Sequence, residues 1–326
     1  MKAVRIHQYG GPEVLVYEDV PIPEPGSAQV LVRVEAASVN PVDVAVREDR
    51  FPTPKKPPKT LGSDGSGIVE TVGGDVTTVR AGDRVFFSGL GVGSEGSYAD
   101  YALIAETQAV LMPATLSFVD AAALGMAFPA AYYGLIRRGK VQAGETVLVQ
   151  GAAGGVGSAS VQLAKALGAR VIATIAGLAQ ADLVRGLGAD ETIDYLREDV
   201  VARTLALTGG KGVDLVHELV ISVNLPIDVR LVAKGGRIVC AGQGPAPEAL
   251  VPIGEALAKD VTLLFMNLTN AGRAGVAAIA AEVAQMAASG RVKPVIGATF
   301  PLAEARRAHE LLAGEHLGKI VLLPGG

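Results

Sequence analysis

The segment from Gly151 to Gly157 carries residue types that can hold a phosphate group. It reads Gly-Ala-Ala-Gly-Gly-Val-Gly and follows the apolar run Val147 to Val149, with Gln150 between them. Small residues let a backbone approach a pyrophosphate closely, and the free N–H groups of a following helix attract the anion. A structural turn is the alternative, but a strand, a helix and a second strand in this order favour a dinucleotide site. That site would consist of Gly151, Ala152, Ala153, Gly154, Gly155, Val156 and Gly157.

The end of the next apolar run bears on which dinucleotide is bound. About 20 residues after such a loop, an Asp or Glu holds the ribose hydroxyls of NAD. Here the run Val171 to Ile175 is followed by Ala176 to Gln180, which contains no acid and no Lys or Arg. Without a carboxylate a 2′-phosphate is not repelled. The sequence therefore favours NADPH over NADH, although it identifies no cation for the phosphate.

The cysteine and histidine content argues against the usual metal centres. Cys240 is the only cysteine, so the chain has no disulfide framework and no thiolate cluster for zinc, and a reducing cytoplasm is expected. Two His-Glu pairs, at His217 and His309, lack the second histidine that a zinc protease has four residues later. We interpret the histidines as surface or satisfied polar residues. No metal site is predicted.

Other catalytic motifs are missing as well. No Gly-x-Ser-x-Gly elbow occurs, and no tyrosine is followed four residues later by lysine. What remains is hydride transfer, in which a cofactor performs the chemical step and the protein supplies orientation and a donor for the oxygen that gains charge.

Charge and hydropathy limit the partners. The chain has 29 basic and 33 acidic side chains, a net charge of -4 and no long run of one sign, so neither nucleic acid nor an anionic membrane is an expected partner. Lys55, Lys56 and Lys59 stand among prolines and are predicted to lie in a solvated loop. The first residues alternate as a strand would and lack the features of a signal peptide, and no apolar run is expected to span a bilayer.

Two kinds of element must position these residues. From Met1 to about Phe118, short β-like segments are broken by Gly, Pro and Asp, which predicts a compact, barrel-like β domain. After Pro129, strands alternate with helix-length segments, as in a doubly wound parallel sheet. The predicted strands of this sheet are Thr146 to Gln150, Val171 to Ile175, Glu191 to Tyr195, Val213 to Leu219, Arg237 to Ala241 and Val261 to Met266.

The last part of the chain is predicted to return to the β domain. Apolar residues recur at three- and four-residue intervals from Val276 to Met286, which predicts a helix that ends near Gly290. An Ala-rich helix around Leu302 to Leu312 and a strand from Lys319 to Leu323 follow.

Taken together, the motifs resemble those of the zinc-independent zeta-crystallin or quinone oxidoreductase branch of the medium-chain dehydrogenases/reductases. The resemblance covers essentially the whole chain and implies a GroES-like catalytic domain of residues 1–120 and 268–326 beside a Rossmann domain of residues 121–267. The motifs are Ala36-Ala-Ser-Val-Asn40-Pro-Val-Asp43, Leu61-Gly-Ser-Asp64-Gly-Ser-Gly, Ala81-Gly-Asp-Arg84-Val, the glycine-rich loop and Gly318-Lys-Ile-Val-Leu.

The resemblance also assigns roles to individual residues. Asn40 and Ser63 stand where zinc-dependent relatives have Cys and His ligands, so catalytic zinc is not expected. Either side chain could donate a hydrogen bond to a developing oxyanion. Asp43 and Asp64 are expected to shape the catalytic cleft, with a structural role as an equal alternative.

Further residues are assigned to substrate and cofactor in the same way. Phe51 and Ala45 stand where tyrosines often line the quinone site. Tyr195 matches a tyrosine near the adenosine phosphate, and Gln180 stands where a lysine often binds the 2′-phosphate. Gly242 and Lys319 complete the expected cofactor site.

The predicted function is an NADPH-dependent, metal-independent reductase of quinones or other α,β-unsaturated carbonyl compounds. Two alternatives remain: an alcohol dehydrogenase type of oxidoreductase, and an NADPH-binding protein without turnover. A homodimer or homotetramer is expected, because the apolar edge strand from Val261 to Met266 could pair across a symmetry axis.

Overall fold

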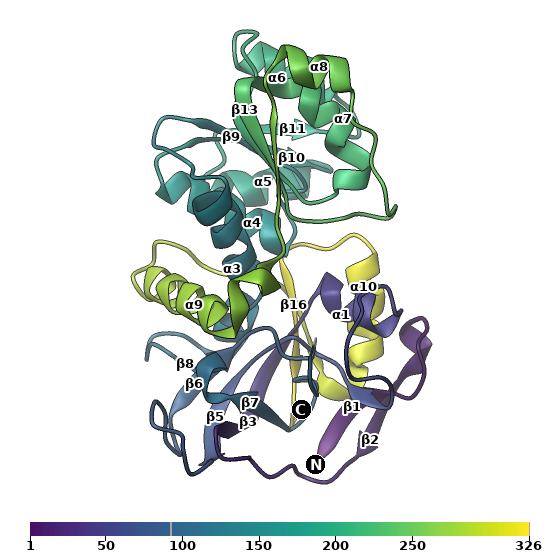
Figure 1. The fold of residues 1–326 in the computed structure, drawn as a ribbon, viewed down its shortest axis with the longest axis vertical. Coiled ribbons are helices and arrows are strands. Elements are labelled where there is room, and N and C mark those ends of the chain that lie inside the picture. Colours follow the sequence, from purple (N-terminus) through teal and green to yellow (C-terminus); the bar gives the residue numbers. More distant parts are fainter. Residues whose placement is uncertain (92, 326) are drawn as a thin grey trace. The chain divides into compact units, whose positions relative to one another are not determined.

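The computed structural model describes residues 1–91 and 93–325, and these form two compact units. The first unit consists of Met1–Pro129 and Ala271–Gly326, and the second is the continuous stretch Ala130–Asn270. In Figure 1 the first unit therefore contains both the purple beginning and the yellow end of the chain.

The second unit is a parallel sheet whose strands alternate with helices (Figure 1). The strand order is β11-β10-β9-β12-β13-β14, which is the order of a doubly wound dinucleotide-binding fold. The predicted Rossmann class and its six strands are confirmed. The strands are β9 (Thr146–Val149), β10 (Arg170–Ile175), β11 (Glu191–Asp194), β12 (Val213–Glu218), β13 (Val232–Cys240) and β14 (Thr262–Phe265). The helices are α4 (Gly155–Ala166), α5 (Leu178–Gly186), α6 (Val200–Leu207), α7 (Ile221–Leu231) and α8 (Ile253–Ala258).

The apolar runs of the second unit become strands because both faces of its sheet are covered. Leu148, Ile172 and Ile238 are fully buried in one hydrophobic cluster with residues of α7. Strands that are buried on both faces are apolar along almost their whole length, which explains why their positions could be predicted from the sequence.

The first unit is built on antiparallel strands. One sheet has the order β15-β16-β3-β5-β6-β8, with β7 also paired to β3, and a smaller sheet has the order β2-β1-β4. The last strand pairs with β3, with Ile320 opposite Val39, so its predicted return to the β domain is confirmed. The strands are β1 (Lys2–Ile6), β2 (Leu15–Asp19), β3 (Gln29–Val39), β4 (Lys59–Thr60), β5 (Asp64–Val72), β6 (Arg84–Phe87), β7 (Tyr101–Ala105), β8 (Val110–Leu111), β15 (Ile296–Pro301) and β16 (Lys319–Leu323).

The helices that lie within the described part of the first unit are α1 (Pro41–Arg47), α2 (Phe118–Leu124), α9 (Gly272–Ala288) and α10 (Ala305–Ala313). α9 buries Val276, Ile279 and Val283, as their spacing predicts, and ends before Gly290, whose φ is +73°. α3 (Ala127–Tyr132) begins in the first unit and continues into a π-helical turn, Tyr133–Arg138. The 3₁₀ turns are Pro12–Val14, Glu106–Gln108, Leu268–Ala271 and Leu302–Glu304.

One of the three lysines that were predicted to be solvated is buried. Lys59 is 0% exposed, because β4 pairs with β1, and its Nζ donates to the Gly91 carbonyl oxygen at 2.9 Å and to Thr53 Oγ1 at 3.3 Å. Lys55 and Lys56 are exposed. The loop prediction is therefore wrong for Lys59, whose surroundings are set by a partner strand far away in the sequence.

The prediction that no apolar run could span a bilayer needs a correction. The helical stretch Phe118–Arg138 is long and apolar enough by composition, with a mean hydropathy of 1.3. However, 67% of its most apolar 18-residue window is buried inside the protein, and α2 ends at Leu124 before α3 begins at Ala127. Packing in the protein core accounts for this composition.

Candidate functional site

The glycine-rich loop joins β9 to α4. Gly151 has a φ of +60°, which an L side chain rarely adopts. At Gly157 a Cβ atom would collide with the Gly151 carbonyl oxygen and lie 2.7 Å from the Cα of Ala152. These two glycines are therefore required by the backbone, and they bring the start of α4 against the end of β9.

The loop is attached to the neighbouring strand by its first two N–H groups. The N–H of Gly151 donates to Thr174 Oγ1 at 2.9 Å, and the N–H of Ala152 donates to the Thr174 carbonyl oxygen at 3.0 Å. No side chain caps α4 at its N-cap residue, Gly154. Because the first N–H groups of a helix have no intrahelical acceptor, those of Gly155 and Val156 are the donors suited to an anion.

Behind the loop lies a buried polar group that the sequence did not predict. Gln150 Nε2 donates to Asp228 Oδ1 at 2.8 Å, and Gln150 Oε1 accepts from Thr174 Oγ1 at 2.8 Å. Asp228 also hydrogen-bonds with Glu218, and both carboxyl groups are fully buried. Burial raises the pKa of both, that of Asp228 further because Glu218 lies beside it. The sequence offered one sign of this group, because an acid, Glu218, stands near the end of the predicted strand Val213 to Leu219.

Three more of the predicted cofactor residues lie near the carboxyl ends of strands in the same sheet. Gln180 accepts a hydrogen bond from the Ala176 N–H at 2.8 Å and so closes the loop after β10. Tyr195 follows β11, is half exposed, and donates its N–H to the Ile175 carbonyl oxygen at 3.1 Å. Gly242 follows β13, and a Cβ there would collide with the Leu219 carbonyl oxygen.

A cation that the sequence analysis missed stands next to Tyr195. The Arg197 side chain is 72% exposed, and its ion-pair partner is Asp194, with 3.7 Å between Arg197 Nε and Asp194 Oδ2. Since β11 is adjacent to β10, the loop with Arg197 follows the strand beside the one that ends at Ile175. Arg197 therefore supplies a positive charge at the carboxyl edge of this sheet, where residues 176–180 contain no Lys or Arg.

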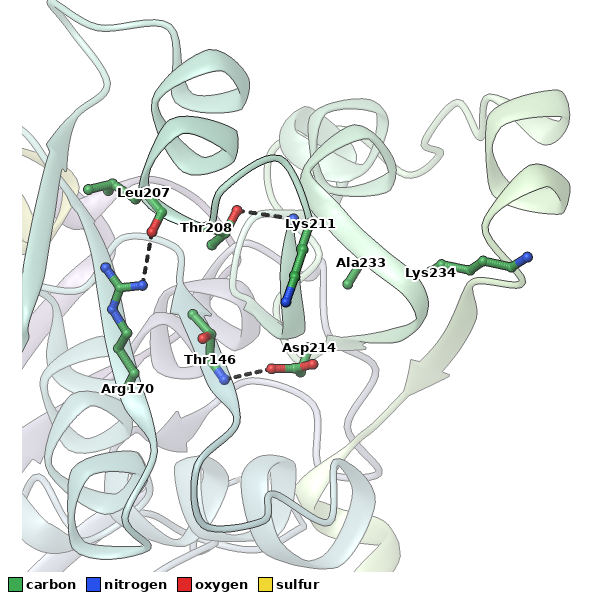
Figure 2. A pocket seen from close by; sticks show the side chains of 9 residues that line it. Thr146, Arg170, Leu207, Thr208, Lys211, Asp214, Ala233 and Lys234 are labelled. Carbon is green, nitrogen blue, oxygen red and sulfur yellow. Dashed lines mark hydrogen bonds between the residues drawn. The ribbon is translucent and has the colours of Figure 1, made fainter.

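A cavity of about 600 Å³ lies elsewhere in the second unit (Figure 2). It is lined by residues at the amino ends of strands, among them Thr146, Arg170 and Asp214, whereas the glycine-rich loop follows a carboxyl end. Ligands of doubly wound sheets bind at the carboxyl ends of the strands. The cavity is therefore not the predicted dinucleotide site.

In the first unit, Asn40 links β3 to α1 and is fully engaged in hydrogen bonds. Its Nδ2 donates to Asp64 Oδ2 at 2.8 Å and to the Ser38 carbonyl oxygen at 3.3 Å, and its Oδ1 accepts from Lys319 Nζ. Its backbone N–H donates to Asp43 Oδ2 at 2.9 Å, in a capping box at the start of α1. The amide orientation is thereby fixed, with the nitrogen toward Asp64.

Asp43 collects three donors. Besides the Asn40 N–H, Ser63 Oγ donates to it at 2.5 Å and the Tyr98 hydroxyl at 3.0 Å. Burial, together with the charge of Asp64, raises the pKa of Asp43 to about 6, although the hydrogen bonds oppose this shift. The hydroxyl proton of Ser63 is directed at Asp43, so Ser63 supports the carboxylate.

Lys319 is the buried cation of this group. Its Nζ donates to the Val39 carbonyl oxygen at 3.1 Å and to Asn40 Oδ1. Burial lowers the pKa of Lys319, and the charges of Asp64 and Asp43 counter that effect. The structure therefore places Lys319 with Asn40, Asp43, Ser63 and Asp64 in one polar group of the first unit, while the glycine-rich loop belongs to the second.

The two residues predicted to line the substrate cleft lie beside this group. Ala45 is part of α1, and Phe51 donates its N–H to the Ala45 carbonyl oxygen at 3.1 Å. The Phe51 ring is half-buried against the hydrophobic core of the first unit.

The two buried histidines, His217 and His309, differ in how many of their ring nitrogens have a hydrogen-bond partner. His309 contacts Arg47 at 2.9 Å and the Tyr98 hydroxyl at 3.3 Å, and burial lowers its pKa to about 3. His217 contacts Ser160 Oγ through Nδ1, but its Nε2 has no partner, and burial lowers its pKa to about 4. Among residues 1–91 and 93–325 no three His, Cys, Asp or Glu side chains form a group that could hold a metal ion.

Known proteins with similar sequences match the whole chain. Residues 26–114 match the alcohol dehydrogenase GroES-like domain, and residues 187–322 match a family described as zinc-binding dehydrogenase. A quinone oxidoreductase of Rattus norvegicus is 36% identical over 99% of this chain and 98% of its own. The quinone oxidoreductase of Pseudomonas aeruginosa is 37% identical over 99% of both.

Solved structures are equally similar. An Escherichia coli quinone oxidoreductase complexed with NADPH superposes with a TM-score of 0.91 at 31% identity, over 99% of this chain and 100% of its own. An NAD-dependent alcohol dehydrogenase superposes with a TM-score of 0.93 at 33% identity, over 100% of both. Sequence identity, full-length coverage and fold agree, and the chain belongs to the quinone oxidoreductase branch of the medium-chain dehydrogenase/reductase superfamily.

Proposed function

We propose that the chain is an NADPH-dependent, metal-independent reductase of quinones or other α,β-unsaturated carbonyl compounds. The observation that carries this proposal is the polar group around Asn40, in which the Asn40 amide is oriented by Asp64 and Lys319 and the Ser63 hydroxyl donates to Asp43. Neither an amide nor the hydroxyl of Ser63 is a usual zinc ligand, which supports chemistry without zinc. Relatives that are named quinone oxidoreductases support the substrate class.

The second unit has the features that a dinucleotide requires. The glycine-rich loop offers unpaired helix N–H groups to a pyrophosphate, and a Cβ atom at Gly151 would meet nothing within 4 Å, so the outer side of the loop is open. We assign Gln180, Tyr195 and Gly242 to the rest of this site, and Arg197 to the 2′-phosphate. The NADPH-bound E. coli relative supports the choice of cofactor.

The cofactor, when bound, supplies a hydride to a carbon that is conjugated with a carbonyl group. The residues of this chain then have to stabilise the oxygen that becomes negative. Asn40 can do so by exchanging its weaker bond, 3.3 Å to the Ser38 carbonyl oxygen, for the substrate oxygen, while Asp64 keeps the amide in place. The positive charge of Lys319 on Oδ1 polarises the amide in the favourable direction. Solvent supplies the proton.

Alcohol dehydrogenation is the second candidate, because one of the similar structures is an NAD-dependent alcohol dehydrogenase. An unactivated alkoxide needs a metal ion or a strong acid beside it, and the oxygen-facing groups here are an amide and a hydroxyl that donates to a carboxylate. A binding protein without turnover is the third candidate.

The test is the oxidation of NADPH, with NADH in parallel, against a benzoquinone, a naphthoquinone, an enone, a haloacrylate and a simple ketone. Turnover of the quinones or the enone with NADPH, and none of the ketone, is the expected result. Reduction of the ketone alone would support the alcohol dehydrogenase, and tight NADPH binding without any turnover would support the binding protein.

We further propose a cytoplasmic homodimer or homotetramer that pairs through β14. This strand is an edge of its sheet, and its Phe265 is 63% exposed. The single cysteine is free and buried, as suits a reducing compartment. Size-exclusion chromatography with light scattering tests the assembly, and a monomer that persists at high protein concentration would contradict it.

A further inference from the structure

A continuous chain of hydrogen bonds connects the glycine-rich loop with a buried pair of acids. The Gly151 N–H donates to Thr174 Oγ1 at 2.9 Å, and this hydroxyl donates to Gln150 Oε1 at 2.8 Å. Gln150 Nε2 then donates to Asp228 Oδ1 at 2.8 Å, and Asp228 hydrogen-bonds with Glu218. The Gln150 amide sets the direction of these bonds, since its nitrogen donates to Asp228 and its oxygen accepts from Thr174. The other acceptor of the Thr174 hydroxyl, the Val149 carbonyl oxygen, lies farther away at 3.5 Å.

The acid pair can exist in this place only with a proton between its carboxyl groups. Glu218 and Asp228 are both 0% exposed, and no donor in the described residues reaches Glu218 Oε2 or Asp228 Oδ2. Two buried carboxylates in contact would repel each other strongly, whereas a carboxylic acid donating to a carboxylate satisfies both oxygens.

The proton belongs to Asp228. Glu218 Oε1 accepts hydrogen bonds from the Val220 N–H and from Asn224 Nδ2, and such donors favour its charged form. Asp228 accepts only from Gln150 Nε2 among the described donors, so its charged form is the less stabilised of the two. An Asp228 protonated on Oδ2 would donate to Glu218 while its Oδ1 accepts from Gln150 Nε2.

Within residues 1–91 and 93–325, neither Asp228 nor Glu218 forms an ion pair with a Lys, Arg or His side chain. On β13, the Cys240 thiol has its pKa raised to about 12 by burial and by the two acids, so it stays neutral. On β12, His217 is directed at Ser160. The charged groups on the adjoining helices pair with one another at the surface: Arg230 with Glu255 and Arg203 with Glu198.

We infer that Asp228, Gln150 and Thr174 are positioning residues for the cofactor, and that the proton shared by Asp228 and Glu218 keeps the glycine-rich loop in its binding conformation. Loss of the proton places a second negative charge behind the loop, and the repulsion between the two buried carboxylates displaces Asp228 from its position beside Gln150. Both effects weaken the binding of a pyrophosphate. The inference rests on the proposed dinucleotide site but not on any substrate.

The experiment measures the Kd of NADPH and of NADH from about pH 7 to about pH 10, the range in which buried carboxyl groups lose their protons. Cofactor fluorescence gives the Kd without turnover. For the wild-type protein we expect the Kd of both cofactors to rise at the alkaline end. NADH is included because it has no 2′-phosphate, so that titration of that phosphate cannot cause a rise common to both cofactors.

Three variants separate positioning from general stability. Asp228→Asn keeps the acceptor for Gln150 and a donor for Glu218 but has no proton to lose, so its Kd should match that of the wild type near pH 7 and stay constant at higher pH. Asp228→Ala leaves Gln150 Nε2 without its acceptor and removes the neighbour of Glu218, and it should weaken binding about tenfold at every pH. Thr174→Val breaks the link to Gly151 and should also bind more weakly, with less response to pH.

The matched control is Thr192→Val, which removes a hydroxyl from the neighbouring strand β11 that contacts Arg185 instead. It should keep both the Kd and the pH response of the wild type. The inference is overturned if Asp228→Asn responds to pH as the wild type does, or if Thr174→Val binds as tightly as Thr192→Val. A wild-type protein that binds neither cofactor would instead defeat the proposed function.

Discussion

Both units contain buried carboxyl groups beside their proposed functional residues. The negative charge of these groups is compensated differently in the two units. In the second unit, Asp228 and Glu218 lie together without a cation, so a proton must be retained. In the first unit, Asp43 and Asp64 lie near the buried ammonium of Lys319 and accept several hydrogen bonds. A proton can be lost to solvent at high pH, whereas the ammonium of Lys319 is held by Asn40 Oδ1 and the Val39 carbonyl oxygen, and the charges of Asp64 and Asp43 oppose the lowering of its pKa by burial. Cofactor binding by the second unit should therefore weaken at alkaline pH. The stability of the first unit should instead depend on the Lys319 side chain.

The largest expected effect is that of Lys319→Met. The change removes the cation and leaves buried carboxylates uncompensated, which should lower the free energy of unfolding by about 3–5 kcal/mol. Urea denaturation measures it, and Lys234→Met, at an exposed lysine of the second unit, is the control and should change it by less than about 0.5 kcal/mol. Equal stability of the two variants would mean that Lys319 does not balance the acids.

Removal of the Asn40 amide should affect turnover more than cofactor binding. Asn40→Ala loses the proposed oxyanion donor, and kcat/KM for a quinone should fall about 10²–10³-fold while the Kd of NADPH stays nearly constant. Asn40→Ser retains a donor and should recover part of the activity. If the alanine variant keeps full activity, another group must hold the oxygen.

Asp43 should make the stability of the protein depend on pH in the acidic range. Its pKa is about 6 in the folded protein against an ordinary 3.8, so the folded state binds the proton more tightly than the unfolded state does. Its contribution to stability is therefore greatest below the ordinary pKa and falls by about 3 kcal/mol as the pH rises through 6. In Asp43→Asn this fall should disappear from the pH series of urea denaturation, whereas Asp75→Asn, at an exposed acid, should retain it. Identical slopes for both variants would contradict the shift.

The smallest expected effect concerns the choice between the cofactors. Arg197→Ala should raise the KM for NADPH about tenfold and leave that for NADH unchanged, because only NADPH has the 2′-phosphate. The control is Arg80→Ala, which removes another exposed arginine with an Asp 3.7 Å from its Nε. A KM that rises equally for both cofactors would place Arg197 outside the phosphate site.

What the sequence predicted depended on local patterns. The strands of the second unit could be located because they are apolar and evenly separated, and the glycine-rich loop because Gly151 and Gly157 meet backbone requirements that adjacent residues reveal. The burial of Lys59 could not be predicted, since it depends on the pairing of β4 with β1.

The supporting residues escaped prediction for the same reason. Gln150 and Asp228 are 78 residues apart, and Asn40 and Lys319 are 279 residues apart. Only the fold brings each pair together. The resemblance to a family did single out Asn40 and Lys319, but not the hydrogen bonds between them or the acid pair behind the loop.

The pairing of β16 with β3 has a consequence for how the protein is made. The second unit is one continuous stretch, Ala130–Asn270, and can close its core while the ribosome is still adding residues. The first unit lacks an inner strand of its sheet, and with it Lys319, until residue 323 has been added. The second unit is thus synthesised before the first can be completed, and the group around Asn40 forms only after Lys319 has been added.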